Sequence, residues 1–301
     1  MNVLVTGATG FLGSHIVKAL CREGHRVSIL KRSSSNCKRI AEVLPELAVY
    51  DIDKTTMDVP FRENKNIDAI IHTATCYGRN NESLTEIVSA NLAFPLQLLE
   101  TACSFGTKIF MNTDTFSNTR YMVSKHLLGY HLTKKHFREW GRHIAEMNKI
   151  RFINMRLEHL YGPFDSDKKF VSYVVKSCME RVPELLLTVG DQERDFIYVD
   201  DAVSAYLLVL QKGKEGVNSC LEYQVGTGKT TSIREFVELA HRKTRSNTIL
   251  KFGAIPFRKN EIMLSKANIA PLAALGWSCK FGLEAGIEAI IRALEDRDEV
   301  I

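Results

Sequence analysis

Hydrophobic residues in the first half of the chain fall into short continuous runs, with turn signals at the C-terminal end of each run. Segments with the length and hydrophobic period of an α-helix separate these runs. Short apolar strands that alternate with helices are typical of a parallel sheet covered on both faces. The sequence therefore predicts a doubly wound, Rossmann-type α/β fold. The expected strands are Val3–Thr6, Val27–Leu30, Leu47–Ile52, Ala69–Thr73, Ile109–Asn112 and Arg151–Leu157, and the expected helices are Phe11–Arg22, Ser83–Ser104 and Tyr121–Met147.

The alternation becomes looser after Leu157, where polar loops separate helix-like segments. We expect a Rossmann domain over residues 1–158, to which residues about 195–228 return, and a smaller C-terminal lobe over residues 159–301. The segments expected to be regular in this part are Phe170–Glu180, Val199–Gln211, Ile233–Arg245 and Leu283–Glu295 as helices and Glu222–Val225 as a strand.

The composition of the 301 residues, with 45% hydrophobic and 25% charged, excludes a disordered chain and a small disulfide-stabilised protein. A formal net charge of +5 is too small to indicate nucleic-acid binding. The seven cysteines form no C-x-x-C pair, so we expect reduced thiols and no metal site. No apolar run approaches the roughly 20 residues that cross a bilayer, and the N-terminus opens directly into a strand. We therefore expect a soluble cytoplasmic protein without membrane or nucleic-acid partners.

A glycine-rich turn lies between the first expected strand and the first expected helix, with the spacing G-x-x-G-x-x-G. Glycine permits positive φ and close backbone approach, and a helix start offers free N–H groups to a pyrophosphate. In this position the motif indicates a dinucleotide-binding turn; the alternative is three turn glycines without a ligand. The residues expected to bind the cofactor here are Gly7, Thr9, Gly10, Phe11, Leu12 and Gly13.

The turn after the second expected strand indicates which dinucleotide binds. NAD favours a carboxylate there, on the ribose 2′-OH, but this turn reads Lys31-Arg32-Ser33. Two cations and a hydroxyl suit a 2′-phosphate, so we expect NADP(H), with a solvated basic turn as the alternative. Asp51 and Ile52, at the end of the third strand, are expected beside the adenine ring, although Asp51 is equally consistent with a turn residue.

A Y-x-x-x-K pattern, Tyr121 and Lys125, follows a strand that leads into Thr113. Residues i and i+4 share one face of a helix. An ammonium beside a phenol lowers the phenol pKa from about 10, so the pair transfers a proton near neutral pH. Ligands in such folds lie at the carboxyl ends of strands. We therefore expect Thr113, Tyr121 and Lys125 to be the catalytic residues.

Together these motifs resemble the extended short-chain dehydrogenases/reductases that act on nucleotide sugars. The resemblance implies that Thr113 hydrogen-bonds the reacting sugar oxygen, Tyr121 is the acid/base and Lys125 also holds the nicotinamide ribose. It adds Thr73, Ala74, Thr75 and Asn91 to the cofactor site. The motifs that carry it are Gly7–Gly13, Ile71–Ala74, Asn91, Thr113, Tyr121 with Lys125, Tyr161–Pro163, Arg194–Asp201, Val225–Gly228 and Leu275–Trp277.

Three loops look like those of the CDP-abequose and CDP-paratose synthases, namely Ala74–Glu82, Arg156–Gly162 and Arg258–Met263. This resemblance implies reduction of the 4-ketone of a nucleotide-linked deoxysugar, CDP-linked by preference, with NADPH, in the synthesis of O-antigen or a related glycan. It assigns the lobe over residues 159–301 mainly to substrate binding. It also implies a homodimer through the helices 83–104 and 121–147.

The resemblance places further residues at the substrate. Arg194 and Arg258 match positions that grip the diphosphate, with a surface salt bridge as the alternative role of each. Lys169 is expected near the nucleotide base. The remaining candidates are Tyr77, Arg79, Asp114, Glu158 and His159, of which Tyr77 and Arg79 are equally consistent with a plain loop, Asp114 with a turn cap and His159 with a buried structural histidine. Lys134-Lys135-His136 is expected to form a solvated helix face.

The triplet Thr113-Asp114-Thr115 bears on the reaction type. Dehydratases of the resembled family carry Thr-Asp-Glu, so the absence of the glutamate disfavours dehydration. A nucleotide-sugar epimerase holds NAD tightly, whereas the basic turn favours exchangeable NADPH and net reduction. An epimerase and a non-catalytic NADP(H)-binding protein remain the alternatives to a 4-ketoreductase.

Overall fold

The computed structural model describes residues 1–64, 66–118, 127–213 and 219–298. The chain forms two compact units. The first consists of Met1–Arg156 and Val203–Tyr223, and the second of Leu157–Ala202 and Gln224–Ile301. Each is described by itself below.

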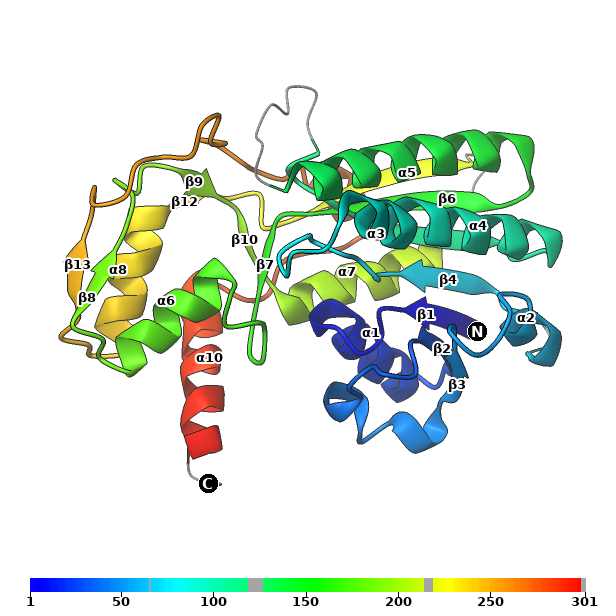
Figure 1. Cartoon of the computed structure of the whole chain (residues 1–301), viewed down its shortest axis with the longest axis horizontal. Helices are drawn as coiled ribbons and strands as arrows, with labels where there is room; N and C mark the ends of the chain where they lie inside the picture. The colour runs from blue at the N-terminus through cyan, green and yellow to red at the C-terminus, as the bar shows by residue number, and fades with distance from the viewer. Residues whose placement is uncertain (65, 119–126, 214–218, 299–301) are drawn as a thin grey trace. The chain divides into compact units, whose positions relative to one another are not determined.

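A seven-stranded sheet forms the centre of the first unit, in the order β11-β6-β5-β4-β1-β2-β3 (Figure 1). Strand β1 pairs in parallel with β2 and β4, β2 with β3, and β4 with β5. This sheet confirms the predicted Rossmann-type fold. The strands are β1 Asn2–Thr6, β2 Arg26–Lys31, β3 Ala48–Asp51, β4 Ala69–His72, β5 Ile109–Thr115, β6 Arg151–Leu157 and β11 Cys220–Val225.

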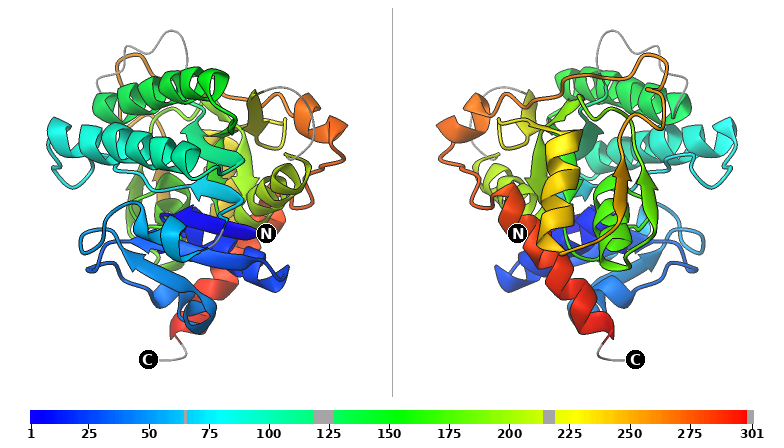
Figure 2. Two further views of the ribbon diagram at one scale, coloured as in Figure 1. Left: turned by 90° about the vertical axis from the view of Figure 1, so that its right-hand side faces the viewer. Right: turned by 90° about the vertical axis from the view of Figure 1, so that its left-hand side faces the viewer.

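Helices cover both faces of this sheet (Figure 1). Helix α1 lies on one side, and α4 and α5 run next to each other on the other side (Figures 1 and 2). The helical elements are α1 Phe11–Arg22, η1 Lys38–Ile40, η2 Leu44–Glu46, α2 Val59–Glu63, α3 Leu84–Val88, α4 Phe94–Ser104, α5 Leu128–Met147 and α7 Val199–Lys212, which begins in the second unit.

The expected helix over 83–104 is interrupted by a π-helical turn, Ser89–Ala93, which joins α3 to α4. Pro95 lies in the first turn of α4 and has no backbone N–H for the regular hydrogen bond to residue 91. Such π-turns are frequent at functional sites, and this one carries Asn91.

Aromatic side chains fix α5 against β5 and β6. The rings of Phe110 on β5, Phe137 on α5 and Phe152 on β6 pack with centroid separations of 5.8–6.0 Å, and all three are fully buried. Gly141 permits this close packing, because a Cβ there would lie 2.2 Å from the Phe152 ring.

The second unit contains short strand pairs and three main helices. Helices α6, α8 and α10 pack against one another (Figures 1 and 2). The strand pairs, which the sequence did not predict, are β7 His159–Tyr161 with β10 Phe196–Tyr198, β8 Glu184–Leu186 with β13 Ile249–Lys251, and β9 Glu193–Arg194 with β12 Thr231–Ser232. The helices are α6 Phe170–Met179, α8 Ile233–Lys243, α9 Ala270–Ala274 and α10 Leu283–Asp298.

The described residues lack two kinds of feature. They contain no helix long and apolar enough to cross a membrane. Nor do they contain a cluster of three or more His, Cys, Asp or Glu side chains arranged to hold a metal.

The expectation of a solvated face at 134–136 is wrong for Lys134, whose exposed fraction is 2%. Lys134 belongs to the buried stripe of α5, four residues after Tyr130 and three before Phe137, whereas His136 is exposed. Its Nζ donates to the carbonyl oxygen of Thr113 at 2.9 Å. Burial lowers the pKa of Lys134 from 10.5 to about 8, and the negative charge of Asp114 opposes this shift.

The lowered pKa of Lys134 makes stability depend on pH. The unfolded chain keeps this proton up to about pH 10.5, whereas the folded chain releases it from about pH 8. The unfolded state binds more protons between these values, so the free energy of unfolding rises with pH across this window. We expect the unaltered chain to gain about 2 kcal/mol relative to Lys134→Met between pH 7 and pH 10, measured by urea unfolding of both proteins.

The control is Lys135→Met, which removes the same charge from the half-buried neighbouring position. We expect this variant to follow the unaltered chain at both pH values. A stability difference between the unaltered chain and Lys134→Met that stays constant from pH 7 to pH 10 contradicts the prediction.

Candidate active site

The glycine turn after β1 is shaped by contacts within the chain. Gly7 has φ 72°, and a Cβ there would lie 2.5 Å from the backbone nitrogen of Ala74. A Cβ on Gly13 would lie 2.2 Å from the carbonyl oxygen of Gly7. Gly10 caps α1 with its backbone only, and among the described residues no side chain caps this helix start. The positive end of the α1 dipole therefore fits a pyrophosphate.

Asn91 ties the loop after β4 to α5. Its Oδ1 accepts from the backbone nitrogen of Cys76 at 2.7 Å and from the Thr75 hydroxyl at 3.3 Å. Its Nδ2 donates to the carbonyl oxygen of Cys76 at 2.7 Å and to the Thr133 hydroxyl at 3.2 Å.

The Thr73 hydroxyl, at the start of the same loop, donates to the carbonyl oxygen of Thr6 at 2.8 Å. Asn91 is thus placed to fix the loop that holds the predicted cofactor residues Thr73, Ala74 and Thr75.

The basic turn after β2 meets two carboxylates from the end of β3. Lys31 Nζ lies 2.5 Å from Asp51 Oδ1, and this hydrogen bond raises the pKa of Lys31. Ser33 donates its backbone N–H to Asp53 at 2.7 Å and its hydroxyl to the same carboxylate at 2.5 Å. The Arg32 side chain is exposed. Sequence reasoning missed Asp53, although the parallel pairing of β2 with β3 brings their carboxyl ends to the same edge.

At the end of β5, Thr113 Oγ1 lies 2.8 Å from the phenol oxygen of Tyr206 on α7. Tyr206 is fully buried, and burial raises its pKa, so its phenol stays protonated at neutral pH. The sequence spacing contains no signal for this contact, because the two residues lie 93 positions apart.

Asp114 is buried in a hydrogen-bond network of its own. Its oxygens accept from the Asn154 side chain at 3.0 Å, from Asn118 at 3.2 Å and from the backbone nitrogen of Thr115 at 2.8 Å. Asn154 also accepts from Asn112 at 2.8 Å. This network fixes the backbone on both sides of Thr113.

The predicted acid/base pair, Tyr121 and Lys125, lies outside the described residues. Near the same part of the sequence, Ser117 Oγ lies 2.8 Å from both Thr115 Oγ1 and His131 Nδ1.

The predicted substrate residues Tyr77 and Arg79 lie in the loop after β4. The Tyr77 ring packs on the buried Tyr130 of α5 with centroids 4.9 Å apart, and the Arg79 guanidinium lies 4.9 Å from the Tyr77 ring centroid. Thr113, Asp114, Tyr77 and Arg79 therefore all lie in the first unit.

The other predicted substrate residues lie in the second unit. Arg194, 5% exposed, donates to Glu261 at 2.9 Å, a partner that sequence reasoning did not assign. Buried Glu158 accepts from Ser265 at 2.5 Å and lies near enough to act on the Arg194 charge. Burial and the charge of Arg194 lower the pKa of His159 to about 3, so His159 is neutral at pH 7. These side chains form a polar cluster around one arginine.

Lys169 and Arg258 are the other two predicted substrate residues in the second unit. Lys169 forms an ion pair with Asp165 at 3.0 Å. Arg258 is exposed, and its carbonyl oxygen accepts from the backbone nitrogen of Glu261 in the same turn.

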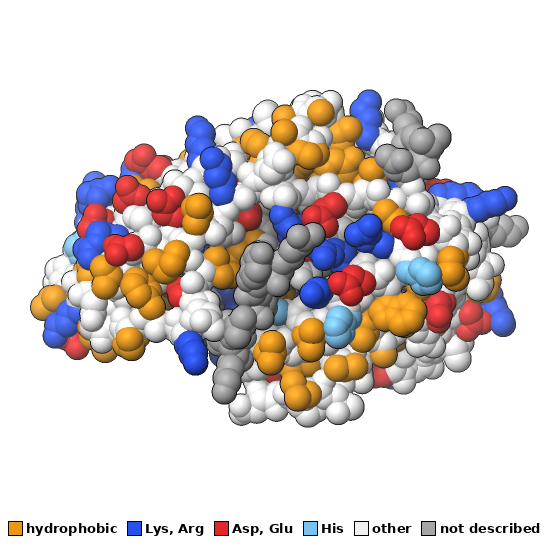
Figure 3. Space-filling model, turned by 90° about the horizontal axis from the view of Figure 1, so that it is seen from above, with side chains coloured by type: hydrophobic (Ala, Val, Ile, Leu, Met, Phe, Trp, Pro, Cys, Tyr) orange, Lys and Arg blue, Asp and Glu red, His pale blue; other side chains and the backbone are white. Residues whose placement is uncertain are grey.

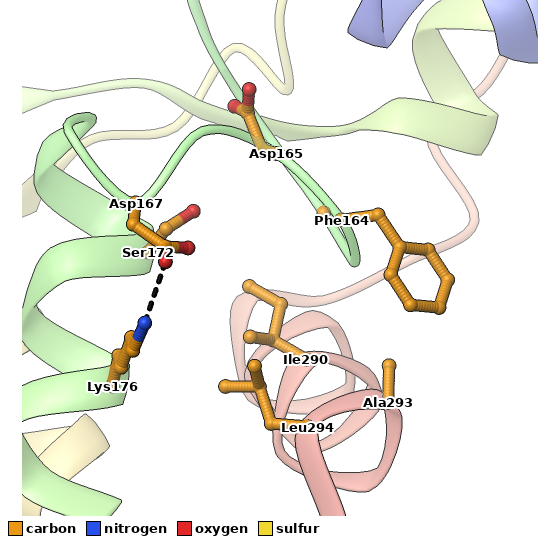
Figure 4. A pocket seen from close by; sticks show the side chains of 9 residues that line it. Phe164, Asp165, Asp167, Ser172, Lys176, Ile290, Ala293 and Leu294 are labelled. Carbon is orange, nitrogen blue, oxygen red and sulfur yellow. Dashed lines mark hydrogen bonds and ion pairs between the residues drawn. The ribbon is translucent and has the colours of Figure 1, made fainter. Parts of the chain in front are cut away.

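A hollow in the second unit lies between α6, α10 and the loop before α6 (Figure 4). An ion pair between Lys176 and Asp167 at 2.6 Å and the apolar side chains of Ile290 and Leu294 line it (Figure 4). None of the predicted site residues lines this hollow.

A family model and two curated enzymes are similar to this chain. Residues 3–226 match the model of the NAD dependent epimerase/dehydratase family. The CDP-abequose synthase of Salmonella typhimurium is 40% identical over 97% of this chain and 98% of that protein. The enzyme of the same name from Salmonella muenchen is 37% identical over 98% of each chain.

Solved structures show the same fold. The UDP-glucose 4-epimerase of Thermotoga maritima, solved with UDP-glucose, has a TM-score of 0.85 at 22% identity, over 99% of both chains. The UDP-glucose 4-epimerase of Thermus thermophilus, solved with NAD, has a TM-score of 0.82 at 22% identity, over 98% of this chain and 99% of that one. Since the family model covers residues 3–226 and the Salmonella typhimurium enzyme is 40% identical over nearly the whole chain, the chain belongs to the NAD dependent epimerase/dehydratase family, the extended short-chain dehydrogenases/reductases that its motifs resemble.

Proposed function

We propose that this chain is an NADPH-dependent 4-ketoreductase of a nucleotide-linked 4-keto-6-deoxy or 3,6-dideoxy hexose, with a CDP-linked sugar favoured. The observation that carries the proposal is the 40% identity to a CDP-abequose synthase over nearly the whole length of both chains. Thr115 occupies the position where dehydratases of the family carry a glutamate, which disfavours dehydration. The basic turn at Lys31-Arg32 favours exchangeable NADPH, and hence net reduction over epimerisation. We place the enzyme in the cytoplasm, in the synthesis of O-antigen or a related glycan.

Several residues of the chain have separate roles in the reduction of the sugar. Reduced nicotinamide, when bound, supplies a hydride to C4. Tyr121 gives its proton to the oxygen that develops negative charge, and Lys125 keeps the pKa of that phenol low. The Thr113 hydroxyl donates a hydrogen bond to the same oxygen and stabilises its charge as it forms. In the second unit, Arg194 and Arg258 bind the diphosphate.

Replacement of Tyr121 by Phe tests the reaction. We expect Tyr121→Phe to reduce NADPH oxidation with CDP-4-keto-3,6-dideoxyglucose by about 10²–10⁴-fold, the usual contribution of a general acid, while NADPH binding persists. NMR of the product gives the configuration at C4. The control is Tyr223→Phe, which removes a phenol oxygen from strand β11.

Full activity in Tyr121→Phe contradicts the assignment of the acid/base. Inversion at C4 without net NADPH consumption favours an epimerase. No NADPH oxidation by the unaltered chain across a panel of 4-keto sugar nucleotides favours a non-catalytic NADP(H)-binding protein.

We propose Arg32 as the contact of the NADPH 2′-phosphate, because its side chain is exposed at the end of β2 while Lys31 is paired with Asp51. A hydrogen bond to a charged group contributes about 1.5–3 kcal/mol. We expect Arg32→Ala to weaken NADPH binding by about 10-fold or more and to leave NADH binding unchanged, measured by fluorescence titration. Arg22→Ala, an exposed arginine at the end of α1, is the control. Binding of NADH as tight as that of NADPH to the unaltered chain contradicts the assignment.

We further propose a homodimer through α3 and α5. Hydrophobic side chains of these helices lie exposed, namely Leu84, Val88, Leu128, Leu132, Trp140 and Met147. Figure 3 shows the face that includes α5, where hydrophobic side chains lie among charged ones. Apolar patches of this kind mark interaction sites.

Light scattering tests this proposal. We expect twice the 34.0 kDa chain mass for the unaltered chain and a monomer for Leu132→Asp, because a buried unpaired carboxylate opposes association. Leu186→Asp is the matched control, since Leu186 in the second unit has the same 46% exposed fraction as Leu132. A monomeric unaltered chain overturns the proposal.

A further inference from the structure

The turn after β2 directs two hydrogen-bond donors at a carboxylate that follows the next strand. Ser33 donates its backbone N–H to Asp53 Oδ1 at 2.7 Å and its hydroxyl to Asp53 Oδ2 at 2.5 Å. Each carboxylate oxygen therefore accepts one of the two donors of a single residue. A backbone N–H and an adjacent hydroxyl are also the donors with which a protein holds a phosphate. Asp53 is thus bound in the way that an anionic ligand would be.

The sheet brings Asp53 to this turn. Strands β2 and β3 run in parallel with Lys31 opposite Asp51, and the backbone nitrogen of Ile52 donates to the Lys31 carbonyl oxygen at 2.8 Å. β2 also pairs in parallel with β1, which leads into the glycine turn. A dinucleotide on such a glycine turn extends its adenosine ribose to the end of the second strand. Asp53 therefore contacts the turn where the substituent on the ribose 2′ carbon is expected.

The other donors of the turn are used within it. The backbone N–H of Ser35 donates to the carbonyl oxygen of Arg32 at 2.9 Å, and the backbone N–H of Arg32 donates to the Ser35 hydroxyl at 3.2 Å. These two hydrogen bonds close the turn on itself. The N–H and the hydroxyl of Ser33 are bonded to Asp53 instead. An incoming phosphate that takes the Ser33 donors must displace that carboxylate.

The Asp53 carboxylate is charged at neutral pH. The two hydrogen bonds from Ser33 lower the pKa of its carboxyl, and the charge of Lys54 acts in the same direction. A phosphate monoester such as the 2′-phosphate of NADPH carries between one and two negative charges at pH 7. A 2′-phosphate at Ser33 therefore meets a like charge as well as occupied donors.

Arg32 acts against this repulsion. Lys31 is paired with Asp51 at 2.5 Å, whereas the Arg32 side chain is exposed at the end of β2. The affinity for a 2′-phosphate is then the balance between an attractive guanidinium and a repulsive carboxylate. A reductase releases its oxidised cofactor in every turnover. A competing carboxylate limits how tightly that cofactor is held, which suits an exchangeable NADPH.

We propose that Asp53 is a specificity-determining residue for the cofactor: its carboxylate occupies the Ser33 N–H and hydroxyl in place of the NADPH 2′-phosphate and weakens the binding of that phosphate. This inference rests on the proposed function, since it needs NADPH at the end of β2. It adds a residue that lowers the preference for NADPH to Arg32, which raises it.

Replacement of Asp53 by Asn tests the inference, because it removes the charge and keeps the size of the side chain. We expect Asp53→Asn to bind NADPH about 5-fold more tightly in a fluorescence titration, the effect of one unit charge about 4 Å away in water, and to bind NADH within about 2-fold of the unaltered chain.

Two smaller probes isolate the phosphate. The nucleotides 2′,5′-ADP and 5′-AMP differ only in the 2′-phosphate and contain no nicotinamide. By isothermal titration calorimetry, we expect Asp53→Asn to bind 2′,5′-ADP about 5-fold more tightly and 5′-AMP as the unaltered chain does.

The control is Glu46→Gln, which removes an exposed carboxylate from η2 in the same unit. We expect this variant to bind all four compounds as the unaltered chain does, because it removes the same charge away from the turn. Asp53→Ala removes the acceptor oxygens together with the charge, and we expect the same direction of change as for Asp53→Asn. Both changes at position 53 affect an exposed side chain, and circular dichroism verifies that each variant is folded.

The sign of the change separates specificity from a structural role. If Asp53 only holds the turn in shape, its replacement weakens NADPH and NADH alike, and that result overturns the inference. An unchanged affinity for NADPH, or an equal gain for NADPH and NADH, also overturns it. In these cases the unaltered chain still binds NADPH more tightly than NADH, so the proposed function stands. Absence of NADPH binding to the unaltered chain overturns the proposed function, and the inference falls with it.

Discussion

The close packing of α5 on β5 is the constraint on which the candidate site depends. Phe110, Phe137 and Phe152 interlock between helix and sheet, and Gly141 lets the helix approach the Phe152 ring. Densely packed aromatic contacts leave little freedom to slide, because each displacement opens a void or forces a clash. Helix and strand therefore keep one register, which places Lys134 at the carbonyl oxygen of Thr113.

Buried polar side chains surround the end of β5. Asp114, Asn154 and Lys134 are nearly inaccessible to water, and each makes a hydrogen bond within the first unit, whereas the neighbouring Asn112 Oδ1 is buried without a partner among the described residues. Hydrogen bonds between buried groups are strong, because the surrounding dielectric is low, and they hold the strand end in place. A rigid strand end suits a hydroxyl that must meet a developing negative charge without reorganising, which is how preorganised donors accelerate reactions.

The second unit presents a comparable arrangement around Arg194. Its guanidinium is buried and paired with Glu261, and Glu158 contributes a second negative charge nearby. A diphosphate that binds Arg194 meets a group already held in place by a carboxylate. In the first unit, Lys31 is likewise paired with a carboxylate, that of Asp51.

Several features followed from the sequence because local chemistry dictates them. Alternating apolar strands and helices can bury their faces only in a layered α/β arrangement, and the seven-stranded sheet is the result. Gly7 and Gly13 are required where the chain crosses itself too closely for a Cβ. The break at Ser89–Ala93 was not predicted, although Pro95 was a local signal for it.

The sequence by itself determined the sheet, the glycine turn and the family motifs, since these depend on neighbours in the chain. Only the tertiary structure decided the partners of the charged and hydroxyl groups: Tyr206 for Thr113, Asp53 for Ser33 and Glu261 for Arg194. Lys134 was expected on a solvated face, although it lies four residues after Tyr130 and three before Phe137 on the buried stripe of α5, and its contact with Thr113 required helix and strand to meet. Hydrogen bonds and ion pairs act over a few ångströms in space, and residues 20 to 93 positions apart come within that range only when the chain has folded.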